Sequence, residues 1–303
     1  MSVTVRVPAK VNAQLAVGAA RADGFHDLAN VFLAVGLYDE VTVTPADELR
    51  VTCEGPDAGQ VPLDRTNLAA RAAIALAERY GRTPDVHVHI AKDIPVAGGM
   101  AGGSADGAGA LLACDALWGT GASREELLDI CAELGSDVPF SLVGGAALGT
   151  GRGEKLTALE VGGTFHWVFA LADRGLSTPA VFREFDRLTE AAGVDIPEPV
   201  ASRELLDALA KGDPDALAAG VSNDLQPAAL SLFPELADTL GAGHAAGALA
   251  TLVSGSGPTT AFLARDTASA AKIAETLRTS GTCRSVRVAS GPAPGATVVG
   301  GRR

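Results

Sequence analysis

The feature that most constrains the fold is a glycine-rich segment at residues 95–110, which leads directly into an alanine- and leucine-rich stretch that ends at Trp118. Glycine allows positive φ angles and lets backbone amides approach a ligand closely. The first turn of a helix adds unpaired N–H groups and a partial positive charge of about half an electron. Because both features favour an anion, the segment predicts a phosphate-binding turn at a helix start.

Two familiar nucleotide-binding motifs do not fit this segment. A P-loop needs Lys and then Ser or Thr after its last glycine, whereas Gly103 is followed by Ser104 and Ala105. A dinucleotide-binding fingerprint directly follows the first strand of its βαβ unit, whereas this segment lies well inside the chain. The ordinary alternative is a mobile connection before a helix capped by Ser104. The glycines alone leave both explanations open.

Composition limits the class of protein. The 303 residues are 47% hydrophobic, which is enough for two domains, and the net charge of −12 argues against a nucleic-acid partner. The four cysteines form no C-x-x-C pair, which is typical of a reducing compartment. The sequence shows neither a signal-peptide core nor a long apolar run. We therefore expect a cytoplasmic protein without a membrane partner.

Hydrophobic periodicity predicts a mixture of strands and helices. Strands are expected at residues 3–7, 11–17, 31–35, 40–44, 49–53, 86–90, 146–150, 167–171, 249–253, 259–263 and 286–289. Helices are expected at residues 66–80, 104–118, 123–135, 202–209, 213–221 and 268–279. This pattern indicates an α+β fold of two domains, residues 1–158 and 159–303. A loose Gly/Pro tail is expected from about residue 291, ending at Arg302 and Arg303.

Three further segments offer reactive or flexible groups. Lys10 and Asn12 are two residues apart, so they lie on the same side of an extended chain. Asp137 follows a predicted helix end, where a loop can direct its carboxylate into a cleft. Residues 254–258, Ser-Gly-Ser-Gly-Pro, form a second glycine turn between two predicted strands. Taken singly, Lys10 is typical of a solvated strand end and Asp137 of a turn residue that bonds its own backbone.

In this order, the segments resemble the GHMP kinases, the family of galactokinase, homoserine kinase, mevalonate kinase and phosphomevalonate kinase. The matching segments are PAKVN at 8–12, RADGFHDL at 21–28, DRTNL at 64–68, residues 95–105, LGSDVP at 134–139, STPAVF at 177–182, NDLQP at 223–227 and SGSGP at 254–258. They span nearly the whole chain. The resemblance therefore favours the phosphate loop over a plain connection at residues 95–105.

The resemblance also implies an architecture and a reaction. The N-terminal domain would carry ATP on a mixed α/β fold with an antiparallel sheet, the C-terminal domain would be ferredoxin-like, and the active site would lie in the cleft between them. The likeness is strongest to the branch that uses ATP and Mg²⁺ to phosphorylate the 2-hydroxyl of a cytidine diphosphate methylerythritol, in isoprenoid precursor biosynthesis outside the mevalonate route. The partners would be small molecules, and the chain a monomer or homodimer.

Residue roles follow from the same resemblance. Lys10 and Asp137 match the catalytic pair, and Asn12 would lie near the hydroxyl-bearing end of the substrate. The triphosphate would be bound by Pro95, Val96, Ala97, Gly98, Gly99, Met100, Ala101, Gly102, Gly103, Ser104 and Ala105, with Ser104 near the ATP-bound Mg²⁺. Phe25 and Phe182 match the two rings that stack on the cytosine, and His26 matches the residue that hydrogen-bonds it.

The sequence departs from the family pattern at four positions. Ala97 and Ala101 stand where glycine is frequent, so a positive φ at either would be strained. Met100 stands where leucine is frequent, and Phe25 replaces a frequent tyrosine while keeping a ring for stacking.

Three other functions remain open at this stage. Another GHMP kinase, acting on homoserine, a mevalonate or a sugar, would have no use for the aromatic positions. A non-catalytic nucleotide-binding sensor would need neither Lys10 nor Asp137. An NAD-dependent oxidoreductase is disfavoured by the position of the glycine loop.

Overall fold

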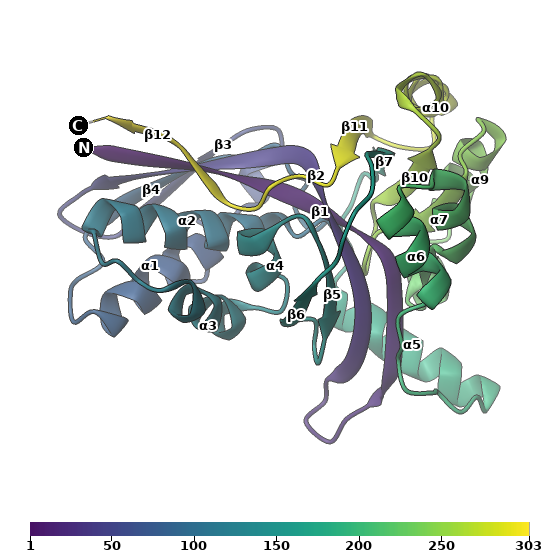
Figure 1. Cartoon of the computed structure of the whole chain (residues 1–303), viewed down its shortest axis with the longest axis horizontal. Helices are drawn as coiled ribbons and strands as arrows, with labels where there is room; N and C mark the ends of the chain where they lie inside the picture. The colour runs from purple at the N-terminus through teal and green to yellow at the C-terminus, as the bar shows by residue number, and fades with distance from the viewer. Residues whose placement is uncertain (303) are drawn as a thin grey trace.

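The computed structural model describes the backbone of residues 1–302 and the side chains of residues 1–300. Figure 1 shows a large twisted sheet with helices on one face, beside a smaller sheet with its own helices. We call these two parts the first and the second lobe. The first sheet has the strand order β12-β1-β2-β4-β3, and the second has the order β11-β7-β10-β9.

Two long antiparallel strands, β1 (Ser2–Ala20) and β2 (His26–Pro45), form the middle of the first sheet. The sequence analysis expected four short strands at residues 3–7, 11–17, 31–35 and 40–44. That prediction is wrong, because β1 and β2 stay paired across shifts in register and each continues as one long strand. The register shifts between Pro8 and Ala9, and such a bulge accommodates a proline inside a strand. The other strands of this sheet are β3 (Arg50–Glu54), β4 (Val86–Ala91), β5 (Ala146–Thr150), β6 (Lys155–Ala158), β8 (Ser222–Asn223) and β12 (Thr297–Arg302).

Helices cover one face of the first sheet, with α2 packed directly on β1 and β2 (Figure 1). A Cβ on Gly109 of α2 would lie 2.8 Å from Val41 and 2.9 Å from Val7, so glycine permits this close approach. The helical elements of this lobe are η1 (Ala58–Gln60), α1 (Leu68–Arg79), α2 (Gly102–Trp118), α3 (Arg124–Leu134) and α4 (Val138–Val143). A capping box of Ser123 and Glu126 begins α3, in agreement with the helix expected from residue 123.

The second sheet has ferredoxin-like topology. Its strands are β7 (Phe165–Leu171), β9 (Ala250–Val253), β10 (Thr260–Ala264) and β11 (Ser285–Gly291). All three pairings are antiparallel, and the fourth strand in the chain lies beside the first. Its helices are α5 (Thr178–Ala192), α6 (Arg203–Lys211), α7 (Pro214–Gly220), α8 (Gln226–Leu232), α9 (Leu236–Ala245) and α10 (Thr267–Ser280). The α+β prediction is confirmed.

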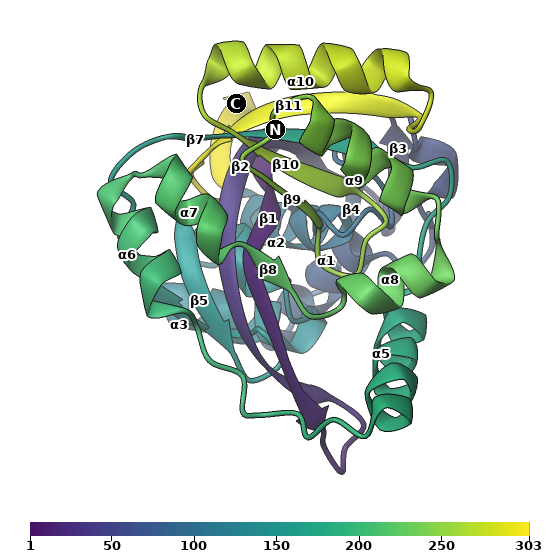
Figure 2. The same cartoon turned by 90° about the vertical axis from the view of Figure 1, so that its right-hand side faces the viewer.

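The two lobes share hydrophobic core, because β7 contributes to both sides. Phe165, Trp167 and Phe169 pack with the core of the first lobe, as the period of two predicts. Val168 and Ala170 point the other way, into the cluster that contains residues of α10. Figure 2 shows α10 lying over β11 on that outer side. The boundary between residues 158 and 159 stays a prediction.

The C-terminal segment is not loose where the structure describes it. After β11 the chain returns to the first lobe, and β12 pairs antiparallel with the edge of β1 (Figure 1). The expectation of a loose tail from residue 291 is therefore wrong, because the open edge of β1 offers backbone partners to a Gly-rich strand. Arg303 lies outside the described residues. Among the described helices, none combines the length and the apolar character needed to cross a membrane.

Candidate active site

One cavity of about 590 Å³ brings together most of the predicted site. The predicted residues that line it are Lys10, Asn12, Phe25, His26, Ala97, Gly98, Gly99, Ala101, Gly102, Gly103, Ser104, Asp137 and Phe182. Pro95 and Val96 lie outside it, in the part of the loop that faces the second lobe. Met100 and Ala105 are fully buried in the core of the first lobe. These four residues of the predicted loop therefore do not line the main cavity.

Lys10 places a buried ammonium in the wall of this cavity, beside the glycine loop. Its Nζ donates to Asn12 Oδ1 and to the carbonyl oxygen of Gly99, both at 2.7 Å, and lies 3.8 Å from Asp137 Oδ2. Burial lowers the pKa of Lys10, and the Asp137 carboxylate opposes that effect. An ammonium carries three donors, so the third remains for Asp137 or for a ligand oxygen.

Asp137 is positioned by the start of α4. It occupies the N-cap position, but its side chain makes no hydrogen bond to the first turn. Its backbone carbonyl instead accepts from Ser141 N at 3.1 Å. The alternative of a turn residue that bonds its own backbone is thus not realised, and the carboxylate faces Lys10 with its side chain 33% exposed.

The glycine loop carries two alanines at positive φ. Ala97 has φ 51° and Ala101 has φ 62°, a region that costs an L-residue about 1–2 kcal/mol. Ala101 is also the N-cap of α2, which begins at Gly102, so Ser104 does not cap the helix. The alternative of a helix capped by Ser104 is not realised, because the helix begins two residues earlier, at Gly102. Ser104 instead lies in the first helical turn and lines the cavity.

The glycine turn at residues 254–258 contacts this loop from the second lobe. Ser254 Oγ donates to the carbonyl oxygen of Gly99 at 3.1 Å. A Cβ on Gly99 would lie only 2.0 Å from the carbonyl oxygen of Ser254, so the contact requires glycine. Gly255 approaches Lys10 and is held by Asn223, whose Nδ2 donates to Gly255 O at 2.8 Å. The sequence revealed this turn but gave no indication of its contact with Gly99.

The other end of the cavity is aromatic. The rings of His26 and Phe182 lie 5.1 Å apart, and His26 Nδ1 contacts Gly18 O at 2.8 Å. His26 Nε2 is 3.5 Å from Asp186 Oδ1, so a ligand bond to this nitrogen would replace that contact. Phe25 is 48% exposed, with the Arg152 guanidinium 5.0 Å from its ring centre. Arg152 lies between Gly151 and Gly153, and no motif in the sequence marked it as a residue of this site.

A buried ion cluster supports the loop from below, and sequence analysis missed it. Lys92 Nζ donates to Asp39 Oδ2 at 2.5 Å and to Asp106 Oδ2 at 2.8 Å. Asp39 also accepts from the backbone amides of Asp93 and Ile94, which precede the loop. Burial raises the pKa of Asp106 to about 8, although Lys92 opposes the rise. The cluster joins β2, the end of β4 and α2 beneath the glycine loop.

A second cavity, of about 240 Å³, adjoins the first. It shares Leu68, Ala97 and Gly103 with the main cavity and is lined further by Asn67 and Val96. The glycine loop therefore separates two hollows, one of which contains the Lys10 and Asp137 pair.

Comparison with known proteins defines the class. The sequence profile described as GHMP kinases N terminal domain matches residues 67–145, and that described as GHMP kinases C terminal matches residues 205–283. The chain belongs to the GHMP kinase family.

Individual relatives are close over the full length. A protein of Streptomyces avermitilis described as 4-diphosphocytidyl-2-C-methyl-D-erythritol kinase is 83% identical over 299 residues, covering 99% of this chain and 100% of that one. A protein of Thermobifida fusca with the same description is 60% identical and covers 98% of both chains.

Solved structures agree in fold. A crystal structure of 4-(cytidine 5'-diphospho)-2C-methyl-D-erythritol kinase has a TM-score of 0.76 at 32% identity and covers 98% of this chain and 100% of its own. Homoserine kinase from Cytophaga hutchinsonii has a TM-score of 0.75 at 20% identity, covering 98% and 97% of the two chains, which shows the shared fold alone.

The contact of Gly99 with Ser254 yields a stability prediction. Gly99→Ala combines a clash with backbone and a positive φ of 73°, so we expect it to reduce the free energy of unfolding by more than about 2 kcal/mol. Gly103→Ala is the matched control, because a Cβ there meets only Leu68 Cδ1 at an ordinary 3.7 Å. Denaturant unfolding of both variants tests this, and equal stability would contradict the described contact.

The ion cluster yields a pH prediction. A carboxyl whose pKa is raised in the folded state stabilises the fold fully below its unfolded pKa of 3.8, and that contribution is lost as pH rises toward about 8. Asp106→Asn removes this dependence. Between pH 5 and 8 we expect the unfolding free energy of the variant to rise relative to that of the wild type, by at most about 1.4 kcal/mol per pH unit. If the unfolding free energies of the wild type and the variant instead changed in parallel with pH, Asp106 would be ionised in the folded state and the prediction would be contradicted.

Proposed function

We propose that this chain is an ATP-dependent kinase that phosphorylates the 2-hydroxyl of a 4-diphosphocytidyl-2-C-methyl-D-erythritol. The observation that carries the proposal is a single cavity with a Lys–Asp pair beside an amide-rich loop at one end and aromatic rings at the other. Relatives 83% and 84% identical are described as kinases of this compound.

ATP would bind across the glycine loop. Its triphosphate would accept hydrogen bonds from the loop amides and the N-terminal turn of α2. The adenosine would occupy the 240 Å³ cavity, which the loop separates from Lys10. Nucleotide-bound Mg²⁺ needs only one or two protein oxygens beside phosphates and water, and the hydroxyl of Ser104 is suitably placed at the cavity wall. The ion would neutralise charge on the phosphates.

The reaction forms one bond and breaks one. The acceptor oxygen bonds to the γ-phosphorus, the bond from that phosphorus to the β–γ bridging oxygen breaks, and ADP leaves. Phosphoryl transfer has a loose transition state, so alignment and charge neutralisation matter more than a strong base. Asp137 orients the hydroxyl and receives its proton late, while the remaining N–H of Lys10 stabilises the transferring group.

The aromatic end would hold the cytidine. Stacking on an aromatic ring is worth about 1–3 kcal/mol per base and accepts any base, so Phe25 and Phe182 would give affinity and hydrogen bonds near His26 would give selection. Arg152 and Arg183 also line the cavity, and their charge suits the diphosphate between cytidine and acceptor hydroxyl.

An acceptor screen tests the proposal. ADP release is measured with ATP and the cytidine diphosphate methylerythritol, mevalonate, homoserine or galactose. We expect turnover with the cytidine compound and background rates with the other three. Preferred turnover of another acceptor would assign a different kinase activity, and ATP binding without any turnover would favour the sensor.

The same assay tests the Lys–Asp pair. Asp137→Ala is expected to lower kcat by about 10²–10⁴-fold and to leave ATP affinity near normal. Asp129→Ala, an exposed position on α3 outside the cavity, is the control. Near-full turnover of Asp137→Ala would contradict the role given to this carboxylate.

A further inference from the structure

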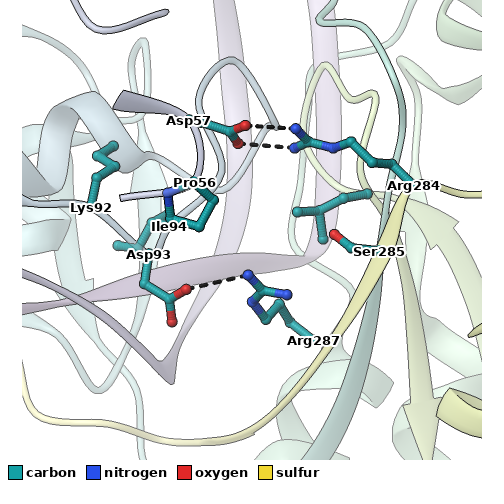
Figure 3. Close-up of a pocket in the computed structure, with 9 residues that line it drawn as sticks. Pro56, Asp57, Lys92, Asp93, Ile94, Arg284, Ser285 and Arg287 are labelled. Atoms are coloured by element: carbon teal, nitrogen blue, oxygen red, sulfur yellow. Dashed lines mark hydrogen bonds and ion pairs between the residues drawn. The ribbon is translucent and has the colours of Figure 1, made fainter. Parts of the chain in front are cut away.

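An ion pair away from the main cavity connects the two lobes (Figure 3). Asp57, just before η1, accepts from Arg284 Nη1 at 2.6 Å and from Nη2 at 2.9 Å. Arg284 directly precedes β11, so the pair joins the first lobe to the second sheet. The Asp57 side chain is 7% exposed and that of Arg284 is 37% exposed, and the bidentate guanidinium–carboxylate geometry fixes how the two partners are oriented.

The same ion pair also adjoins the glycine loop. Arg284 lines a small hollow together with Pro95 and Val96 of the loop, and Val96 immediately precedes Ala97, one of the two alanines at positive φ. The hydrogen bonds from Arg284 are the main cause that lowers the pKa of Asp57, and the backbone N–H of Val96 adds to this lowering. Asp57 is therefore bonded twice to the second lobe through Arg284, and Arg284 in turn adjoins the loop. Neither Asp57 nor Arg284 lines the cavity that holds Lys10, so their effect on a ligand there would pass through the loop.

The second lobe anchors its side of this connection firmly. The backbone N–H of Arg284 donates to Leu171 O at 2.7 Å, at the end of β7. Gly175, a few residues beyond β7, lies against Ala97, since a Cβ on it would be 3.0 Å from the Ala97 Cβ. A strained backbone conformation persists only when its surroundings determine it, and these contacts surround Ala97 from the second lobe.

We propose that Asp57 and Arg284 are positioning residues for the phosphate loop. The pair holds Val96 and Ala97 in the geometry that directs the loop amides at the ATP triphosphate, so the affinity for ATP depends on the attachment of the second lobe. This inference rests on the proposed function, because it takes the loop as the ATP site.

A neighbouring pair provides a matched control. Asp93 and Arg287 join the same two lobes across the same hollow of about 230 Å³, with Arg287 Nη2 3.4 Å from Asp93 Oδ1 (Figure 3). Neither Asp93 nor Arg287 lines the small hollow that Arg284 shares with Pro95 and Val96 of the loop. Arg287→Gln thus removes an inter-lobe charge pair without removing a loop contact.

The experiment compares Arg284→Gln with Arg287→Gln in the full chain. KM for ATP, KM for the cytidine acceptor, kcat and the melting temperature are measured for each, with ATP affinity by calorimetry. We expect Arg284→Gln to raise the ATP KM and Kd about tenfold, which corresponds to about 1.4 kcal/mol, while the acceptor KM changes less than about twofold. Arg287→Gln should leave both KM values within about twofold of the wild type.

Two further variants make the test specific. Asp57→Asn combined with Arg284→Gln should cost ATP affinity little more than Arg284→Gln alone, because the two residues act as a unit. Arg284→Lys, which keeps a cation but loses the bidentate geometry, should fall between wild type and Arg284→Gln and also serves if the glutamine variant does not fold.

Three results would overturn the inference: equal changes in both KM values, equal effects of Arg284→Gln and Arg287→Gln, or a fall in melting temperature with unchanged ATP affinity. Failure of the proposed function is distinguishable, because the wild type would then not phosphorylate the cytidine compound. The calorimetric ATP comparison would still test the pair.

Discussion

The site depends on the contacts that the buried ammonium of Lys10 makes. Two of its three donors are used by Asn12 Oδ1 and Gly99 O, so its position ties β1 to the glycine loop. Its third N–H donor remains available to Asp137, which lies at the start of α4. Burial of a lone ammonium is costly, and these partners offset that cost. The charge is therefore fixed where a phosphoryl group can meet it, before any ligand arrives.

The glycine loop is held from several sides, and this explains how it tolerates alanine. Ser254 contacts Gly99 from the second lobe, and the cluster of Lys92, Asp39 and Asp106 supports the chain beneath it. Residues at positive φ such as Ala97 and Ala101 keep that conformation only in a rigid setting. Shared core between the lobes supplies the rigidity, since β7 packs into the first lobe with one face.

Local patterns in the sequence predicted much of the fold and the members of the main cavity. Strand β5 and the capping box at Ser123 were predictable because their signals are local. The union of short segments into β1, the pairing of β12 with β1, and the Lys92 cluster were not, because each depends on partners distant in the chain. The motifs of residues 8–12 and 134–139 identified Lys10 and Asp137, whereas the distance between these side chains required the structure.

The central claim is that the terminal phosphoryl group of ATP lies between Lys10 and Asp137. A crystal structure with a non-hydrolysable ATP analogue and the cytidine diphosphate methylerythritol measures this directly. The account predicts a γ-phosphoryl oxygen within about 3.2 Å of Lys10 Nζ and the acceptor hydroxyl at hydrogen-bond distance from an Asp137 oxygen. A triphosphate bound away from the glycine loop, or an acceptor hydroxyl out of reach of Asp137, would contradict it.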